Sequence, residues 1–210
     1  MRLLHVDSSI LGDASASRRL SSAIVSSLTR ANPKIVVTYR DLGAKPLPHL
    51  DGRLMAAATP NAPADEETRA AAEDSARALE EFLAADVIVI GAPMYNFTVS
   101  SQLKAWIDRI LVAGKTFRYT ERGPEGLMRG KRVIIASSRG GAYGAGSPNA
   151  PYDFQETYLS TTFSFIGIDD VEFVRAEGLA MGPEQREANL RAALEMVPQL
   201  ATNVSRAHVI

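Results

Sequence analysis

The sequence contains no cysteine, which excludes disulfide bonds, thiolate nucleophiles, iron–sulfur clusters and Cys-bound zinc. With only three histidines in 210 residues, a His-rich metal site is not expected either. Neither sign of charge predominates, because 23 Lys and Arg are balanced by 24 Asp and Glu, for a net charge of −1. The chain therefore lacks the basic surplus that is typical of proteins that bind nucleic acid or anionic membranes.

Long hydrophobic runs are also missing from the sequence. The longest strongly apolar run, residues 87–90, is far too short to span a bilayer. The N-terminus leads directly into the apolar residues 3–6, without the cleavage region of a signal peptide. Hydrophobic residues make up 46% and charged residues 22% of the chain, as is usual in soluble globular proteins. We therefore expect a cytoplasmic protein with a single domain over residues 1–210 and no membrane partner.

Short apolar runs alternate along the chain with longer stretches of helical periodicity. Strands are predicted at residues 3–6, 35–39, 87–90, 133–136 and 171–174. Helices are predicted from the apolar stripes within residues 20–28, 72–83, 103–111, 152–165 and 190–197. Residues 41–64 contain four prolines and are expected to form a long loop or lid. Strands that alternate with helices predict an α/β fold with a parallel sheet and right-handed crossovers.

The turn after the first strand, residues 7–17, is rich in serine. Ligands of open parallel sheets bind beyond the carboxyl ends of the strands, so this turn is a candidate binding element. It matches neither GxGxxG nor a P-loop, because no Gly-Lys-Ser/Thr follows. Ser9, Ser15 and Ser17 together with helix N-terminal N–H groups could hold a phosphate, whereas a single serine there could simply cap the helix. Both interpretations remain open at this point.

The turns after the third and fourth strands have compositions that suit a flat ring system. The third strand opens into Pro93, Met94, Tyr95, Asn96 and Phe97. The fourth is followed by Ser138, Arg139, Gly140 and Gly141. Aromatic side chains can cover a ring face, and glycines allow a backbone to approach a ligand closely. The alternatives are aromatic packing in the core and a merely flexible loop, but all three turns should converge at one edge of the sheet.

Several motifs follow one another in an order and at a spacing that identify a family. They are Ser9, residues 15–17, residues 93–97, the segment LKAWID at 103–108, TFRYT at 116–120, GPEGL at 123–127 and SRGG at 138–141. The sequence thereby resembles the bacterial FMN-dependent NADH:quinone oxidoreductase and azoreductase family over nearly its whole length. This resemblance implies a flavodoxin-like three-layer α/β/α fold with strand order 2-1-3-4-5. It also implies a homodimer with one tightly, non-covalently bound FMN per subunit near the interface.

The resemblance also implies roles for individual residues. By this correspondence, the FMN phosphate is held by Ser9, Ser15, Ala16 and Ser17. Pro93 and Met94-Tyr95-Asn96-Phe97 would run along the isoalloxazine ring and the ribityl chain, and residues 138–141 would contact the polar edge of the ring. Tyr119 and Phe163 match aromatic positions that wall the substrate pocket, across the dimer interface. The chain departs from the family pattern at Ser100, where proline is usual, and at Val112, where arginine is usual.

The activity that this resemblance implies is ping-pong transfer of a hydride from NADH or NADPH, through N5 of FMN, to a quinone or an azo compound. No catalytic side chain and no metal are expected, because the cofactor supplies the chemistry. A 2′-phosphate on the nicotinamide cofactor would require a nearby cation, for which Arg18, Arg19 and Arg139 are candidates. The alternatives are an FMN electron carrier or sensor without turnover, and a nitro- or chromate-reducing enzyme of the same fold.

Two further residues are expected to be structural. His5 lies within the first predicted strand and is interpreted as a hydrogen-bonded core histidine rather than a catalyst. Trp106 belongs to the apolar stripe of its helix and is expected to pack in the core.

Overall fold

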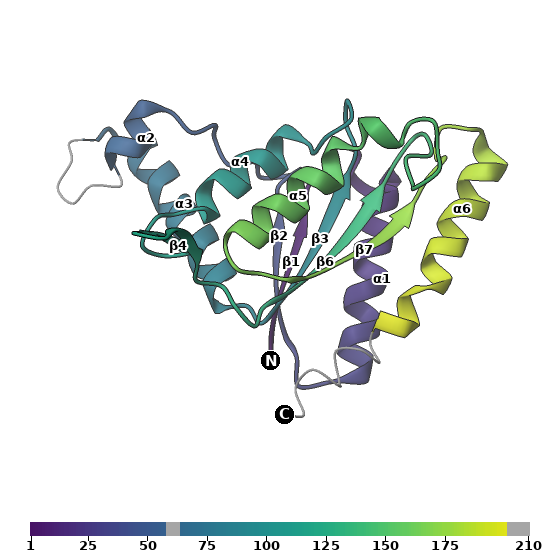
Figure 1. Cartoon of the computed structure of the whole chain (residues 1–210), viewed down its shortest axis with the longest axis horizontal. Coiled ribbons are helices and arrows are strands. Elements are labelled where there is room, and N and C mark those ends of the chain that lie inside the picture. Colours follow the sequence, from purple (N-terminus) through teal and green to yellow (C-terminus); the bar gives the residue numbers. More distant parts are fainter. Residues whose placement is uncertain (58–63, 201–210) are drawn as a thin grey trace.

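The computed structural model describes residues 1–57 and 64–200 of the chain. Five parallel strands form one sheet in the order β2-β1-β3-β6-β7, which confirms the order 2-1-3-4-5 among the predicted strands (Figure 1). The strands are β1 (Arg2–Asp7), β2 (Val36–Asp41), β3 (Val87–Pro93), β6 (Arg132–Ser138) and β7 (Asp170–Ala176). Their carboxyl ends all lie at the same edge of the sheet, at the end opposite the N-terminus.

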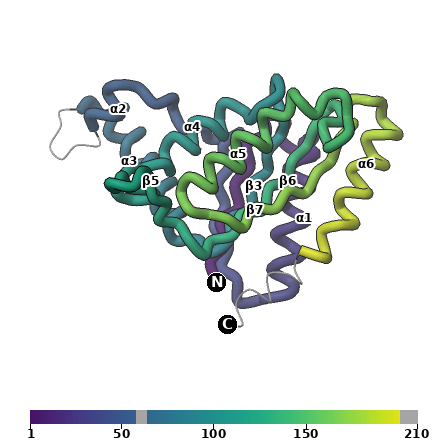
Figure 2. Tube along the Cα trace, viewed as in Figure 1, coloured from purple at the N-terminus to yellow at the C-terminus, as the bar shows by residue number. Residues whose placement is uncertain are grey.

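Helices cover both faces of this sheet, so the molecule has the predicted three layers (Figures 1 and 2). One face packs against α1 (Ala16–Ala31) and α6 (Pro183–Glu195). The other packs against α3 (Glu66–Ala84), α4 (Ser101–Ile110) and α5 (Phe154–Phe165). No helix in the described part of the chain is long and apolar enough to cross a membrane.

The core consists of two apolar clusters that the sheet separates. Successive residues of β3 contribute to them alternately, with Ile88 and Ile90 in one cluster and Val87 and Val89 in the other. Every residue of β3 is buried, as expected for a central parallel strand covered on both faces. Trp106 is fully buried and packs edge-on against a phenylalanine ring of α3, which confirms its predicted place in the core.

The structure differs from the predicted elements in the segments that connect them. Part of the expected loop at 41–64 forms the short helix α2 (Gly52–Ala57), and residues 58–63 of that loop lie outside the described residues. A β-hairpin, β4 (Phe117–Thr120) with β5 (Gly123–Gly126), was not predicted. Its strands are four residues each and rich in glycine, charge and proline, so they carry no apolar alternation. Ser100, in place of the usual proline, caps α4 by accepting a hydrogen bond from Leu103 N–H at 3.2 Å.

The hairpin is docked closely against the C-terminal end of α5. Met128 N–H donates to the Ile166 carbonyl at 2.8 Å, and the rings of Phe117 and Phe165 are 4.8 Å apart. Gly126 lies so close to the backbone of Ile166 and Gly167 that an added Cβ atom would overlap it. A glycine at this position is therefore required by close packing.

We expect Gly126→Ala to lower the free energy of unfolding by about 1–3 kcal/mol, because backbone atoms must move to admit the methyl group. The matched control is Gly52→Ala at the start of α2, where an added Cβ meets no atom within 4 Å. Urea unfolding followed by circular dichroism measures both variants. Equal stability of the two would contradict the close packing of the hairpin.

Candidate functional site

Three turns meet at the carboxyl edge of the sheet, after β1, β3 and β6. Backbone hydrogen bonds join them where the strands end. Ser8 N–H donates to the Gly91 carbonyl at 3.2 Å, and Met94 N–H donates to the Ser138 carbonyl at 2.8 Å. The predicted convergence of the three turns on one edge is therefore confirmed.

The serine turn, residues 8–17, leads through the 3-10 helix η1 (Gly12–Ala14) into α1. Ser15 caps α1, since its Oγ accepts from Arg18 N–H at 3.2 Å. Ser17 Oγ lies 3.0 Å from Ser15 Oγ, and Ser9 Oγ lies 3.3 Å from Tyr95 Oη. Helix capping thus accounts for Ser15 but not for Ser9 or Ser17, which are both buried. The N–H groups of Ala16 and Ser17, in the first helical turn, have no intrahelical acceptor and are available to an anion.

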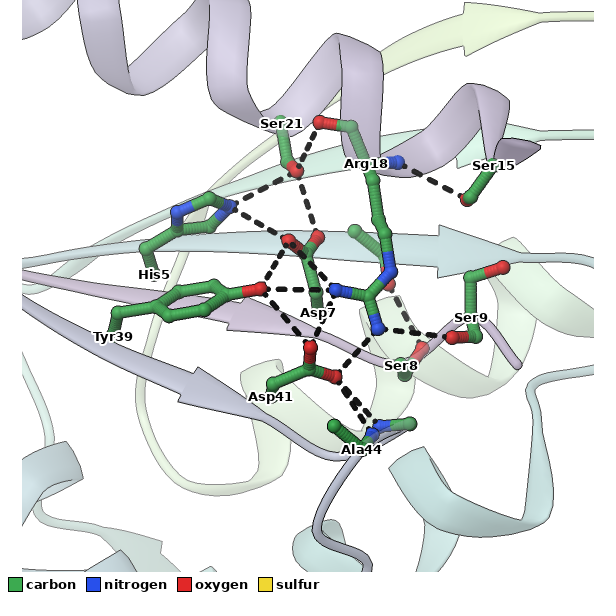
Figure 3. Close-up of polar contacts among 12 residues, drawn as sticks. His5, Asp7, Ser8, Ser9, Ser15, Arg18, Ser21, Tyr39, Asp41 and Ala44 are labelled. Carbon is green, nitrogen blue, oxygen red and sulfur yellow. Dashed lines mark hydrogen bonds and ion pairs between the residues drawn. The ribbon is translucent and has the colours of Figure 1, made fainter. Parts of the chain in front are cut away.

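A partly buried polar cluster lies beside this turn, at the carboxyl ends of β1 and β2 (Figure 3). Asp7 accepts hydrogen bonds from Ser21 Oγ at 2.7 Å and from Tyr39 Oη at 3.2 Å. His5 Nε2 lies 3.0 Å from Ser21 Oγ and 3.3 Å from Asp7 Oδ2. His5 is therefore a hydrogen-bonded core histidine, as predicted.

Arg18 and Asp41 form the charged part of the same cluster. The guanidinium donates from Nη1 and Nη2 to the two carboxylate oxygens of Asp41, at 2.6 and 2.5 Å. The N–H groups of Gly43 and Ala44 also donate to Asp41 Oδ1, each at 3.0 Å. These hydrogen bonds, those from Arg18 above all, lower the pKa of Asp41 to about 2. Burial and the nearby carboxylates raise the pKa of Tyr39 to about 12.

The turn after β3 has an unusual backbone conformation. Asn96 and Phe97 are consecutive non-glycine residues with positive φ, at 47° and 74°. Tyr95 and Thr98 exchange backbone hydrogen bonds across them, at 2.9 and 3.1 Å. Positive φ at a bulky residue is costly and persists mostly where function requires it. The Phe97 ring is 48% exposed and tilts toward Tyr152, with 5.9 Å between the ring centroids.

A cavity of about 700 Å³ opens beside this turn. Its volume lies within the range of small-molecule sites. The residues that line it are Ile10, Tyr95, Asn96, Thr98, Val99, Ser101, Gln102, Lys104 and Tyr158. The cavity thus connects the serine turn with the turn after β3 and with the first turns of α4.

Arg139, in the turn after β6, is held within the protein. Its guanidinium is 1% exposed and forms ion pairs with Asp153 at 2.8 Å, with Glu177 at 3.2 Å and with Glu156. Its Nε donates to Ser137 Oγ at 2.9 Å. The Arg139 side chain is therefore fully paired inside the protein, which leaves the backbone of residues 138–141 for the predicted contact with the ring edge. These contacts join the turn after β6 to the start of α5 and to the end of β7.

The two aromatic residues that were predicted to wall the substrate pocket differ in their exposure to solvent. Tyr119 is 75% exposed on β4 and stands edge-on to Phe117. Phe163 is fully buried in α5 and belongs to the core cluster between that helix and the sheet. Because Phe163 has no exposed surface, the structure does not bring it into the wall of the cavity. Of all the residues predicted to contact the cofactor or the substrate, Tyr95 and Asn96 line this cavity and the others do not.

Residues 1–200 match a protein family whose members are described as having a flavodoxin-like fold. An FMN-dependent NADH:quinone oxidoreductase of Methylocella silvestris is 57% identical over 95% of this chain and 98% of its own length. A protein of the same name from Ralstonia nicotianae is 59% identical over 92% of this chain and 93% of its own. The chain belongs to the family of FMN-dependent NADH:quinone oxidoreductases. The resemblance inferred from the sequence motifs is thereby confirmed.

Solved structures of this flavodoxin-like family share the architecture closely. An azoreductase from Bacillus anthracis superposes with a TM-score of 0.84 at 29% identity, covering 97% of this chain and 99% of that one. An FMN-dependent NADH-azoreductase from the same species, in complex with FMN, gives a TM-score of 0.87 at 25% identity with the same coverage.

Three residues of the site were not predicted from the sequence. Asp41 was assigned to a loop, although a carboxylate a few residues after a β-branched run is typical of the polar end of a strand. Arg18 was considered only as a contact for a 2′-phosphate. Gln155 is fully buried, accepts from Ser137 Oγ at 2.7 Å and donates to the Ala92 carbonyl at 3.2 Å. A glutamine in a helical stretch carries no signal of such a role.

We expect Asp41 to make stability depend on pH in acid. Its folded-state pKa is depressed, so its contribution is complete above about pH 4 and is lost as pH falls from about 4 to about 2. In Asp41→Asn, the free energy of unfolding should fall less steeply over this interval than in the wild type. Urea unfolding at a series of pH values measures the slopes. Asp13→Asn, an exposed position, should keep the wild-type slope.

Proposed function

We propose that this chain is an FMN-dependent oxidoreductase that uses NADH to reduce quinones, with azo compounds as further acceptors. The observation that carries this proposal is the identity of 57% with the Methylocella silvestris NADH:quinone oxidoreductase over 95% of the chain. The 25% identity to the FMN-bound azoreductase of Bacillus anthracis supports the cofactor and the azo substrates.

The residues of the serine turn fit the phosphate end of FMN. The N–H groups of Ala16 and Ser17 have no intrahelical acceptor, and they point from the positive end of the α1 dipole. The hydroxyls of Ser9, Ser15 and Ser17 lie in the same turn and add donors. These groups are those that a phosphate dianion requires.

The turn after β3 fits the ring end of FMN. Residues 94–97 would supply backbone groups and aromatic surface to the isoalloxazine, and the loop at 138–141 would meet its polar edge through backbone atoms. When bound, FMN supplies the two-electron redox chemistry. The protein would bind the cofactor, orient a planar substrate against it and exclude water. Phe97 would shield one side of the substrate site from solvent.

Further parts of this proposal come from the family resemblance. They are a homodimer, a cytoplasmic location and a contribution of Tyr119 to the substrate pocket of the partner. The high exposure of Tyr119, at 75%, favours a role on a surface that another subunit covers.

The proposed activity predicts two separable half-reactions. Mixing the FMN-loaded protein anaerobically with NADH should bleach the flavin absorbance near about 450 nm. Adding benzoquinone should then restore it, in a stopped-flow absorbance experiment. Free FMN at the same concentration is the control for uncatalysed reduction. Flavin that binds but stays oxidised with NADH would instead support the electron carrier or sensor.

We also predict a preference for NADH over NADPH. The three arginines considered as partners of a 2′-phosphate are all engaged: Arg18 by Asp41, Arg139 by three carboxylates and Arg19 by Glu187 at 3.3 Å. None of these three guanidiniums is free to pair with the extra phosphate, whose charge loses part of its hydration on binding without compensation, so kcat/KM should be about 10-fold higher with NADH. Steady-state assays with both cofactors measure this ratio. An equal or greater kcat/KM with NADPH would contradict the prediction.

A further inference from the structure

Arg18 connects the charged cluster to the backbone of the serine turn. Besides Asp41, its Nη2 donates to the carbonyl of Ser9 at 3.1 Å (Figure 3). Its Nη1 also lies 3.0 Å from Tyr39 Oη and 3.9 Å from Asp7 Oδ2. This arrangement requires a glycine at position 43, because an added Cβ there would overlap the Ser9 carbonyl. One guanidinium therefore joins α1, the end of β2 and the first residues of the turn.

The hydrogen bond to Ser9 fixes the direction of a peptide group. The peptide that follows Ser9 is trans, so its N–H, which belongs to Ile10, points opposite to the Ser9 carbonyl. Since Arg18 holds that carbonyl, the Ile10 N–H is directed away from the charged cluster. It has no acceptor among the described residues, and Ile10 lines the cavity beside the turn. Arg18 thus orients a free donor.

The charge of Arg18 matters as well as its geometry. Two carboxylates, Asp7 and Asp41, lie in the cluster next to the serine turn, and Arg18 is the guanidinium that faces both. A phosphate dianion bound at the N-terminus of α1 would be repelled by these carboxylates if the guanidinium were removed.

We propose that Arg18, supported by Asp41, is a positioning residue that makes this chain select phosphorylated over unphosphorylated flavin. It does so by orienting the Ser9–Ile10 peptide and by offsetting the two carboxylates beside the phosphate end of the cofactor. This inference rests on the proposed FMN site and extends it to a residue outside the serine hydroxyls.

The test compares FMN with riboflavin, which lacks the phosphate. Flavin-free protein is titrated with each, and quenching of flavin fluorescence gives the two dissociation constants. Arg18→Met should weaken FMN binding by about 10- to 100-fold, as expected for loss of a charged hydrogen-bonding group, with riboflavin binding changed less than about 3-fold. Arg19→Met is the matched control, because it removes the same charge from the same helical turn but from an exposed pair.

The ratio of the two dissociation constants separates positioning from a loss of folded protein, since both flavins report on the same sample. An equal loss for both flavins, or an Arg18→Met ratio equal to that of Arg19→Met, would overturn the inference. If Arg18→Met does not fold, Arg18→Lys is judged by the same ratio. Lysine keeps the charge but cannot donate to the Asp41 carboxylate and the Ser9 carbonyl at the same time as a guanidinium does. The dissociation constant of riboflavin divided by that of FMN should therefore still fall. An unchanged ratio in Arg18→Lys then overturns the inference.

The wild type distinguishes this inference from the proposed function. Wild-type protein that binds FMN no better than riboflavin would overturn the FMN site and the inference with it. Wild-type protein that prefers FMN, together with an Arg18→Met variant that keeps the preference, would overturn the role of Arg18 alone.

Discussion

The candidate site depends on backbone hydrogen bonds that continue the pairing of the sheet beyond its strands. Ser8 N–H to the Gly91 carbonyl and Met94 N–H to the Ser138 carbonyl tie each turn to its neighbour at its first residue. Because β3 is buried along its whole length, this edge cannot shift without disturbing close-packed core on both faces. The three turns are therefore held at a fixed spacing, as recognition of a rigid planar ligand requires.

Arg18, which is partly buried, and Arg139, which is fully buried, hold the outer turns, and the edge strands supply their carboxylate partners. Arg18 lies in the first turn of α1, directly after the serine turn, and Asp41 reaches it from the end of β2. Arg139 belongs to the turn after β6, and Glu177 reaches it from just after β7. Burying a guanidinium is unfavourable unless its donors are paired, so each arginine can adopt its position only when the edge strand is in place. The edge strands β2 and β7 thus contribute to the site without contacting the cavity.

The sequence predicted the regular elements well and the connecting segments poorly, for physical reasons. Periodicity located all five sheet strands. For β1, β3 and β6 the reason is that burial on both faces of a parallel sheet produces continuous apolar runs. The edge strand β2 has no buried residue and was recognised from its β-branched residues. Periodicity did not indicate the strand order, which came only from the family resemblance. The β4–β5 hairpin was missed because its short strands gain their stability by docking on α5 rather than from an apolar alternation of their own.

The location of the site could be predicted where it depends on the course of the backbone. The serine turn and the turn after β3 lie at strand ends, where a parallel fold places ligands, so their position could be inferred. Side-chain partnerships could not be, because they join residues distant in sequence. Arg139 pairs with Glu177, which is 38 residues away in the sequence, and no local sequence pattern indicates that pair. Phe163 was predicted within a helix, but which face of the helix meets the sheet depends on packing.

The Asn96–Phe97 turn is the place where local sequence preference and the observed structure disagree most. Tyr95 and Thr98 pair across two residues with positive φ, which is the geometry of a type I′ turn. Asparagine tolerates the positive φ of residue 96. The positive φ of residue 97 favours glycine, and a phenylalanine there costs on the order of 1–3 kcal/mol. Glycine would relieve this strain but would remove the ring that leans toward Tyr152. The strain is therefore explained by what the ring provides, an aromatic surface at the carboxyl end of the central strand.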